Sequence, residues 1–215
     1  MKAVVDQVHA KGLKFGLYGD AGTMTCAGWP GSQGHEEQDA KTIASWGVDY
    51  WKHDACYTPC STGGVPQTCW TPQSPTQSYY SKMRDALAKS GRPILFSMCQ
   101  WGRDSVWTWG KDYGNSWRMS GDIANSWNSL ASIAATAAGI AQYSAPGGFN
   151  DLDMLQVGNG GLNENEERAH VGLWMIAKSP ILIGTDLSKL KQSTLTILKN
   201  KVCGLTKNSS FMRVC

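Results

Sequence analysis

Two aspartates have neighbours that could support acid–base or nucleophilic chemistry. Asp54 ends the run YWKHD (50–54), and the period-two alternation of a strand places Lys52 on the same side as Asp54. A lysine beside a buried carboxylate would keep it ionised, as a nucleophile requires. Asp122 follows Arg118, whose guanidinium suits bidentate contact with ligand oxygens. Structural roles stay open, because Lys52 and Asp54 could form a buried ion pair and Asp122 could be a helix N-cap.

Other arrangements that carry out chemistry are missing from the sequence. The four histidines form no metal-binding cluster, no G-x-S-x-G elbow presents a serine nucleophile, and no G-x-G-x-x-G or Walker loop follows a strand-like segment. We therefore expect no metal and no nucleotide cofactor. What remains is a set of carboxylates, an arginine, a lysine and tryptophan rings. Glycoside hydrolysis uses this set, because two carboxylates perform the chemistry and aromatic faces hold the sugar ring.

The chain alternates between strand-like and helix-like segments, which predicts an α/β fold with a parallel sheet and crossover helices. The expected strands are 13–20, 48–54, 93–99, 115–122, 148–155 and 180–186. The expected helices are 1–11, 36–46, 76–90, 126–143, 163–178 and 188–200, and 57–75 should be a loop rich in Pro, Thr, Ser, Gly and Cys. Helices should end at Gly47 and Gly91, and Thr76, Ser126 and Ser188 should be N-caps.

Polar side chains stand at or near the carboxyl ends of all six expected strands. They are Asp20, Asp54, Cys99, Asp122, Asp153 and Asp186. In a (β/α)8 barrel these ends converge on one face, where active sites are built, although an open doubly wound sheet would also collect ligands there. Asp20, Asp151 and Asp153 could therefore bind hydroxyls or cap loops. Because a barrel has eight strands, we expect an incomplete TIM barrel that lacks about two βα units before residue 1.

The composition excludes several other classes of protein. The 215 residues carry 20 basic and 17 acidic side chains, a net charge of +3, and the basic residues are scattered along the chain. A nucleic-acid-binding protein would need a clustered basic face. No apolar run approaches the roughly 20 residues of a membrane span. Ten Trp and 24 Gly instead suit a loop-rich enzyme with a flat-walled pocket.

Six segments resemble glycoside hydrolase family 27, in the form of the fungal α-galactosidases. They are GLYGDAGTMTCAGWPGS (16–32), SWGVDYWKHDAC (45–56), SMCQWG (97–102), WRMSGDIANSW (117–127), FNDLDML (149–155) and SPILIGTDL (179–187). They occur in family order and fall at the expected strand ends. The resemblance covers residues 1–200 and implies a (β/α)8 barrel that removes terminal α-galactosyl residues from oligosaccharides or galactomannans by a retaining double displacement.

The resemblance also implies a role for individual residues. Asp54 would be the catalytic nucleophile and Asp122 the acid/base. The implied substrate-binding residues are Lys52 and Arg118 at the sugar hydroxyls, Cys99 and Trp101 around the sugar 2-position, and Met154 under the sugar. Cys99 with Trp101 would favour galactose over an N-acetylated sugar.

The seven cysteines favour disulfides over a metal site. Cys56 and Cys60 have a ligand-like spacing, but no second close pair completes a zinc site. The resemblance implies a bridge between Cys26 and Cys56, a local second bridge between Cys60 and Cys69 is also expected, and Cys99 should remain a thiol in the pocket. Disulfides imply an oxidising compartment, so we expect an extracellular protein, although MKAVVDQVHAKG (1–12) does not form a signal peptide.

The chain also departs from the family pattern. Its G-W-N-S-W strand, the following strand with an Asp pair, and the C-terminal β-domain are missing, so we expect residues 1–200 to form a partial barrel and 201–215 an atypical tail. An open sheet edge is an aggregation hazard. A second hypothesis is therefore a catalytically inactive fragment or pseudoenzyme, or a remnant that only binds galactose. The sequence predicts neither the natural substrate nor the oligomeric state.

Overall fold

The computed structural model describes residues 1–59, 61–62, 65–66 and 75–200. The chain divides into two compact units, which we call the N-terminal unit (Met1–Arg118) and the C-terminal unit (Met119–Cys215). Each is described by itself. No helix within the described ranges is long and apolar enough to cross a membrane.

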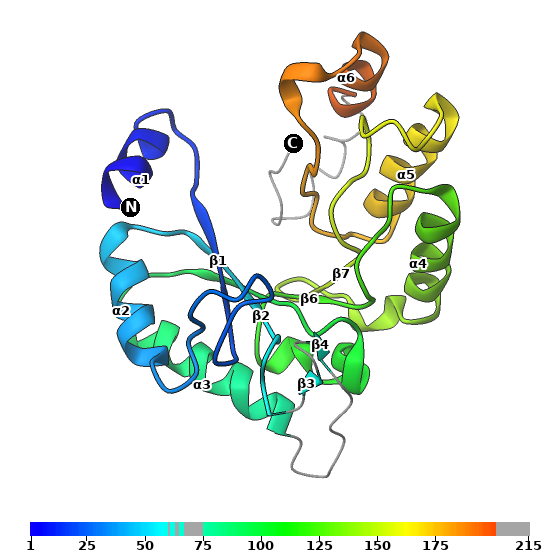
Figure 1. Cartoon of the computed structure of the whole chain (residues 1–215). Coiled ribbons are helices and arrows are strands. Elements are labelled where there is room, and N and C mark those ends of the chain that lie inside the picture. The colour runs from blue at the N-terminus through cyan, green and yellow to red at the C-terminus, as the bar shows by residue number, and fades with distance from the viewer. Residues whose placement is uncertain (60, 63–64, 67–74, 201–215) are drawn as a thin grey trace. The chain divides into compact units, whose positions relative to one another are not determined.

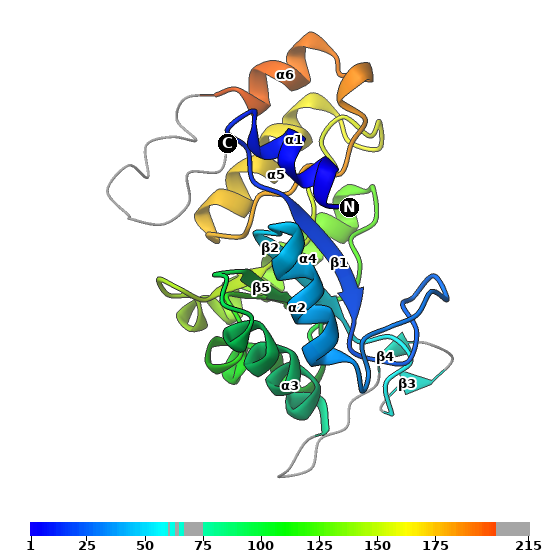
Figure 2. The ribbon, with the colours of Figure 1, turned by 90° about the vertical axis from the view of Figure 1, so that its left-hand side faces the viewer.

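A parallel sheet with helices on one side forms the centre of the N-terminal unit. Its elements in chain order are α1 (Lys2–His9), β1 (Gly16–Asp20), α2 (Glu36–Trp46), β2 (Tyr50–Asp54), β3 (Ser61–Thr62), β4 (Val65–Pro66), α3 (Pro75–Lys89), β5 (Leu95–Met98) and β6 (Ser116–Arg118). The strands β1, β2, β5 and β6 lie side by side in this order and all run parallel. Figures 1 and 2 show α2 and α3 together on one side of these strands. The predicted α/β class with parallel strands is confirmed.

Alternation along β2 separates the core from the opposite face of the sheet. Trp51 and His53 are buried, whereas Lys52 between them is partly exposed, as the period-two pattern predicts. The His53 ring lies 6.1 Å from the Tyr80 ring of α3 and 5.8 Å from the Phe96 ring of β5, measured between centroids. The core of this unit therefore lies between the sheet and its helices. The other face of the sheet is left for the polar side chains.

Two glycines of the N-terminal unit are required by geometry. Gly47 ends α2 with a φ of 86°, the left-handed conformation that glycine adopts without a steric penalty, and this confirms the predicted helix end. A side chain on Gly19 of β1 would overlap the indole of Trp51. Only a glycine here lets β1 lie beside β2 with Trp51 in the core.

Two helices of the C-terminal unit begin at side-chain caps. Its elements are α4 (Trp127–Gly139), β7 (Phe149–Asp151), α5 (Glu164–Ile176) and α6 (Gln192–Leu198), with 3-10 turns at Ala141–Tyr143 and Leu187–Lys189. Ser126 caps α4 as predicted, because its hydroxyl accepts the N–H of Ser129. Asn163 and Glu166 form a capping box at the start of α5.

The strand predicted over 180–186 is not formed. Instead, an isolated parallel bridge joins Leu155 to Ile183. The N–H of Leu155 donates to Leu182, and the N–H of Gly184 donates to Leu155. Pro180 has no N–H, which limits how far a ladder can continue toward the start of this segment.

Two of the predicted N-caps are wrong because their hydroxyls have carboxylate partners. Ser188 donates its hydroxyl to Asp186 at 2.6 Å, and the Asp186 carboxylate also accepts the Ser188 N–H. This holds a 3-10 turn, and α6 begins only at Gln192. Thr76 lies inside α3 and donates its hydroxyl to Asp104 at 2.6 Å. Within the predicted loop 57–75, β3 and β4 form a short antiparallel pair.

Acid should destabilise this fold through its buried histidines. Burial lowers the pKa of His53 to about 3, so the folded state keeps this ring neutral while the unfolded chain binds a proton near pH 6.5. Stability due to His53 is therefore complete above pH 6.5 and is lost as the pH falls toward 3. On acidification from pH 7 to pH 5, we expect the melting temperature of the wild type to decrease relative to that of His53→Asn, as followed by circular dichroism.

The matched variants are His53→Asn and His35→Asn, the latter at an exposed position. His53→Asn should have a lower melting temperature at pH 7 but lose less on acidification, whereas His35→Asn should keep the wild-type slope. An unchanged slope in His53→Asn would show that His53 is not the titrating group.

Candidate active site

The register of β1 and β2 places two carboxylates side by side at the carboxyl end of the sheet. Asp20 of β1 is the direct partner of Asp54 in β2. Asp20 is fully buried and Asp54 is 6% exposed. Like charges this close are unfavourable in a buried setting unless hydrogen-bond donors stabilise them. The surrounding donors therefore decide what each carboxylate can do.

Three donors fix the carboxylate of Asp54. Its Oδ1 accepts the N–H of Ala55 at 2.9 Å and the indole N–H of Trp101 at 3.0 Å. Its Oδ2 accepts the hydroxyl of Tyr18 at 2.9 Å. Hydrogen bonds to both oxygens hold this carboxylate in one orientation.

The buried ion pair between Lys52 and Asp54, a structural role that the sequence left open, is not formed. The Lys52 ammonium instead lies 5.9 Å from the centre of the Tyr18 ring, and the salt bridges within the described residues include none between Lys52 and Asp54. Alternation fixes the side of the sheet to which a side chain belongs, not where its long stem ends. Neutral hydrogen-bond donors, rather than the Lys52 ammonium, contact the Asp54 carboxylate.

Tyr18 is the residue of this site that sequence reasoning missed. Tyr18 alternates with Asp20 along β1, and the register places both on the same face of the sheet as Asp54 of β2. The strand pattern could therefore have indicated Tyr18 as a site residue. Burial, followed by the negative charge of Asp54, raises the pKa of Tyr18 well above its usual range. The phenol therefore stays protonated and remains a donor to Asp54.

Asp20 caps loops, which is one of the two roles that the sequence left open for it. Its Oδ1 accepts the N–H of Gly22 at 2.8 Å, and its Oδ2 accepts the N–H of Cys56 at 3.1 Å. Both of its oxygens therefore bind backbone of the segments that follow β1 and β2. Burial, with a smaller contribution from the charge of Asp54, raises the pKa of Asp20 to about 7, although the N–H of Gly22 opposes this shift.

A disulfide joins the same two segments, as predicted. Cys26 and Cys56 are bridged, with their Cα atoms 5.2 Å apart. The sulfur of Cys26 lies 3.4 Å from Asp54 Oδ2. Asp20, Cys26, Asp54 and Cys56 would resemble a metal-binding cluster by proximity, but a disulfide supplies no thiolate ligand. The predicted bridge between Cys60 and Cys69 lies outside the described residues.

Cys99 and Arg118 adjoin the carboxylates on the same side of the sheet. Cys99 follows β5, is buried, and is a thiol outside any disulfide, as predicted. Arg118 ends β6, is 2% exposed, and places Nη1 3.8 Å from the sulfur of Cys99. The N-terminal unit therefore contains the predicted residues Asp54, Lys52, Trp101, Cys99 and Arg118, together with Tyr18, which was not predicted.

The remaining predicted residues lie in the C-terminal unit. Asp122 is exposed and lies in the turn beyond β6, because this strand ends at Arg118 rather than at 122 as predicted. Asp153 is buried, and its Oδ2 accepts the N–H of Ile123 at 2.9 Å, which fixes the backbone next to Asp122. Its Oδ1 accepts the N–H of Met154, whose side chain is 39% exposed.

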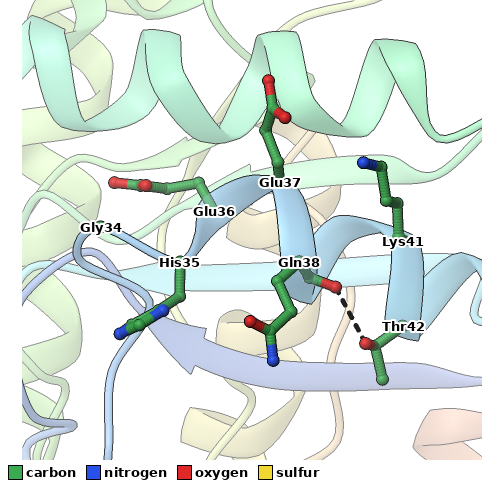
Figure 3. Close-up of a pocket in the computed structure, with 7 residues that line it drawn as sticks. All are labelled: Gly34, His35, Glu36, Glu37, Gln38, Lys41 and Thr42. Atoms are coloured by element: carbon green, nitrogen blue, oxygen red, sulfur yellow. Dashed lines mark hydrogen bonds between the residues drawn. The ribbon is translucent and has the colours of Figure 1, made fainter.

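A separate hollow of about 650 Å³ lies over the start of α2. Figure 3 shows Glu37 and Lys41 on the same side of the helix and Glu36 pointing away from them, with Thr42 donating to the carbonyl of Gln38 within the helix. Binding sites hold polar groups that converge on one ligand. This surface has no such convergence and none of the strand-end carboxylates line it.

The raised pKa of Asp20 gives stability a second pH dependence of opposite sign. Between its unfolded pKa near 3.8 and about 7, the folded state binds the extra proton, so this contribution is complete below pH 3.8 and is lost as the pH rises through 7. We expect the wild-type melting temperature to fall between pH 6 and pH 8.5, and Asp20→Asn to fall less. The control Asp39→Asn, at a partly exposed position of α2, should keep the wild-type slope. Equal slopes in all three proteins would contradict this assignment.

Comparison with known proteins gives consistent matches. The family model described as Alpha galactosidase A matches residues 1–208. Alpha-galactosidase 2 of Arabidopsis thaliana is 49% identical over 202 residues, covering 94% of this chain and 48% of that protein. The family match continues into the segment 201–215 that the sequence sets apart.

Solved structures agree with these matches. The crystal structure of alpha-galactosidase I from Mortierella vinacea superposes with a TM-score of 0.87 at 40% identity, covering 94% of this chain and 54% of the other. The structure of the α-galactosidase from Saccharomyces cerevisiae with raffinose superposes with a TM-score of 0.83 at 38% identity, covering 91% of this chain and 46% of the other. The chain therefore spans about half the length of these relatives.

Proposed function

Because this chain belongs to the family described as Alpha galactosidase A, we propose that it hydrolyses terminal α-galactosyl residues with retention of configuration. The family membership confirms the resemblance to glycoside hydrolase family 27. Relatives from a plant and from fungi match at similar levels, so the comparisons support the family rather than a fungal subgroup. We likewise propose that the whole protein has the (β/α)8 barrel and this activity.

The observation that carries the proposal is the environment of Asp54. A carboxylate nucleophile must be ionised and must present its oxygen in one orientation. Tyr18, Trp101 and the Ala55 N–H supply three hydrogen bonds to this carboxylate. Asp54 would attack the anomeric carbon and form a covalent glycosyl intermediate, with the leaving oxygen protonated by an acid on the other side of the bond.

Asp122 is the proposed acid/base. It is exposed, as a group that exchanges a proton with water must be, and the Asp153 carboxylate fixes the backbone beside it. Asp122 would protonate the leaving group in the first step and deprotonate a water in the second. The proposed substrate contacts are Lys52, Arg118, Cys99, Trp101 and Met154.

The relatives support a substrate class. One related α-galactosidase structure contains raffinose, an α-galactosyl oligosaccharide. We assign oligosaccharides and galactomannan side chains as substrates. The Cys26–Cys56 bridge supports an extracellular location, because disulfides persist in oxidising compartments.

Substitution at Asp54 and at Asp122 should have different chemical consequences. Asp54→Asn should lower kcat/KM for a nitrophenyl α-galactoside by roughly 10³-fold or more, because no covalent intermediate forms. Asp122→Asn should lose less with this activated leaving group, which departs without a proton. Azide should restore turnover in Asp122→Asn and give a galactosyl azide that retains the α configuration.

Asp112→Asn, at an exposed position of the N-terminal unit, is the matched control and should keep wild-type rates. A wild-type rate no higher than that of Asp54→Asn would refute hydrolysis by this chain. Calorimetric binding of galactose would then favour the binding remnant, and no binding would favour the inactive fragment.

A further inference from the structure

The segment that carries Trp101 has an unusual backbone. Trp101 has a φ of 58°, and Asp104 and Ser105 have φ values of 53° and 47°. Residues other than glycine rarely adopt this left-handed backbone conformation, and they keep it only when neighbouring groups hold them. Contacts with neighbouring groups must therefore hold the segment 100–105 in this conformation.

Helix α3 supplies two of the groups that hold this segment. The hydroxyl of Tyr80 donates to Gln100 Oε1 at 2.9 Å, directly before Trp101. The hydroxyl of Thr76, one helical turn earlier, donates to Asp104 Oδ2 at 2.6 Å. Tyr80, Gln100, Thr76 and Asp104 are all buried. Buried hydrogen bonds of this kind have no water to replace them, so losing one leaves a polar group unsatisfied.

One contact to β6, one turn within the segment and one indole add to this support. The N–H of Gly102 donates to the carbonyl of Arg118 at 3.0 Å, and the N–H of Arg103 donates to the carbonyl of Gln100 at 2.9 Å. The indole of Trp109 also donates to the carbonyl of Asp104 at 2.9 Å. The segment is thus held on both sides, and the Trp101 indole N–H reaches Asp54 Oδ1 at 3.0 Å.

We propose that Tyr80 and Thr76 are positioning residues, which act through Gln100 and Asp104 to hold the Trp101 indole against Asp54. The role of this indole in catalysis rests on the proposed function. Neither Tyr80 nor Thr76 needs to touch substrate, because both bind side chains of the segment that carries Trp101. The helix that covers the sheet would thereby determine the geometry of the nucleophile on its opposite face.

The test follows the indole of Trp101 directly. In a 1H–15N spectrum the indole N–H resonances come from ten tryptophans, and Trp101→Phe identifies one of them by its disappearance. Tyr80→Phe keeps the ring in the core and removes only the hydroxyl. Thr76→Val keeps the shape of threonine without its donor, whereas Thr76→Ser keeps the donor.

We expect Tyr80→Phe and Thr76→Val each to shift or broaden the Trp101 resonance, and Thr76→Ser to leave it in place. With the nitrophenyl α-galactoside, kcat should fall on the order of tenfold for the first two, with a smaller change in KM, because a misplaced group costs alignment in the transition state. The matched control is Tyr113→Phe, which removes only the phenol hydroxyl from a ring that packs against the same core.

The two readouts separate failure of this inference from failure of the proposed function. If the wild type does not turn over substrate, the resonance still decides whether α3 positions Trp101. An unmoved resonance in both Tyr80→Phe and Thr76→Val would overturn the inference. A moved resonance with unchanged kcat in an active enzyme would overturn it as well. Thermal unfolding of each variant identifies any that fails to fold, and the other variant then carries the test.

Discussion

The pairing of β1 with β2 in one register is the constraint on which the rest of the site depends. It places Tyr18 beside Lys52 and Asp20 beside Asp54, and a shift of one strand by one residue would move its two side chains to the core face. The hydrophobic partners fix this register from the other side. Trp51 and His53 fill the core only when Asp54 faces away from it. Burial of aromatic rings thus selects the arrangement of the polar face.

The polar face is then stabilised by the segments that follow the strands. Asp20 binds backbone N–H groups after both β1 and β2, and the Cys26–Cys56 bridge links the same two segments covalently. After β5, the strained segment 100–105 brings an indole to Asp54. Three successive connections therefore converge on one carboxylate. Loops on a rigid sheet commonly carry the functional groups of a parallel α/β fold in this way.

Much of this arrangement could be predicted from the sequence, because it depends on local patterns. Alternation in YWKHD separated Asp54 from His53, and Gly47 marked the end of α2. Family motifs, rather than spacing, indicated the Cys26–Cys56 bridge. Predictions failed where a distant side chain competes for a local role: Thr76 and Ser188 look like caps until Asp104 and Asp186 accept their hydroxyls. The partner of Lys52 and the strand over 180–186 could not be predicted for a similar reason. Both depend on side chains or backbone from distant parts of the sequence.

The disulfide also has a consequence for how this part of the chain matures. Its two cysteines are 30 residues apart, with the whole of α2 between them, and their sulfurs meet only beside the paired ends of β1 and β2. Pairing of β1 with β2 brings the two cysteines together, so the fold itself favours this bridge. In a chain that has formed this bridge, the segments after β1 and β2 are joined covalently, which keeps Tyr18 and Asp54 within reach of each other.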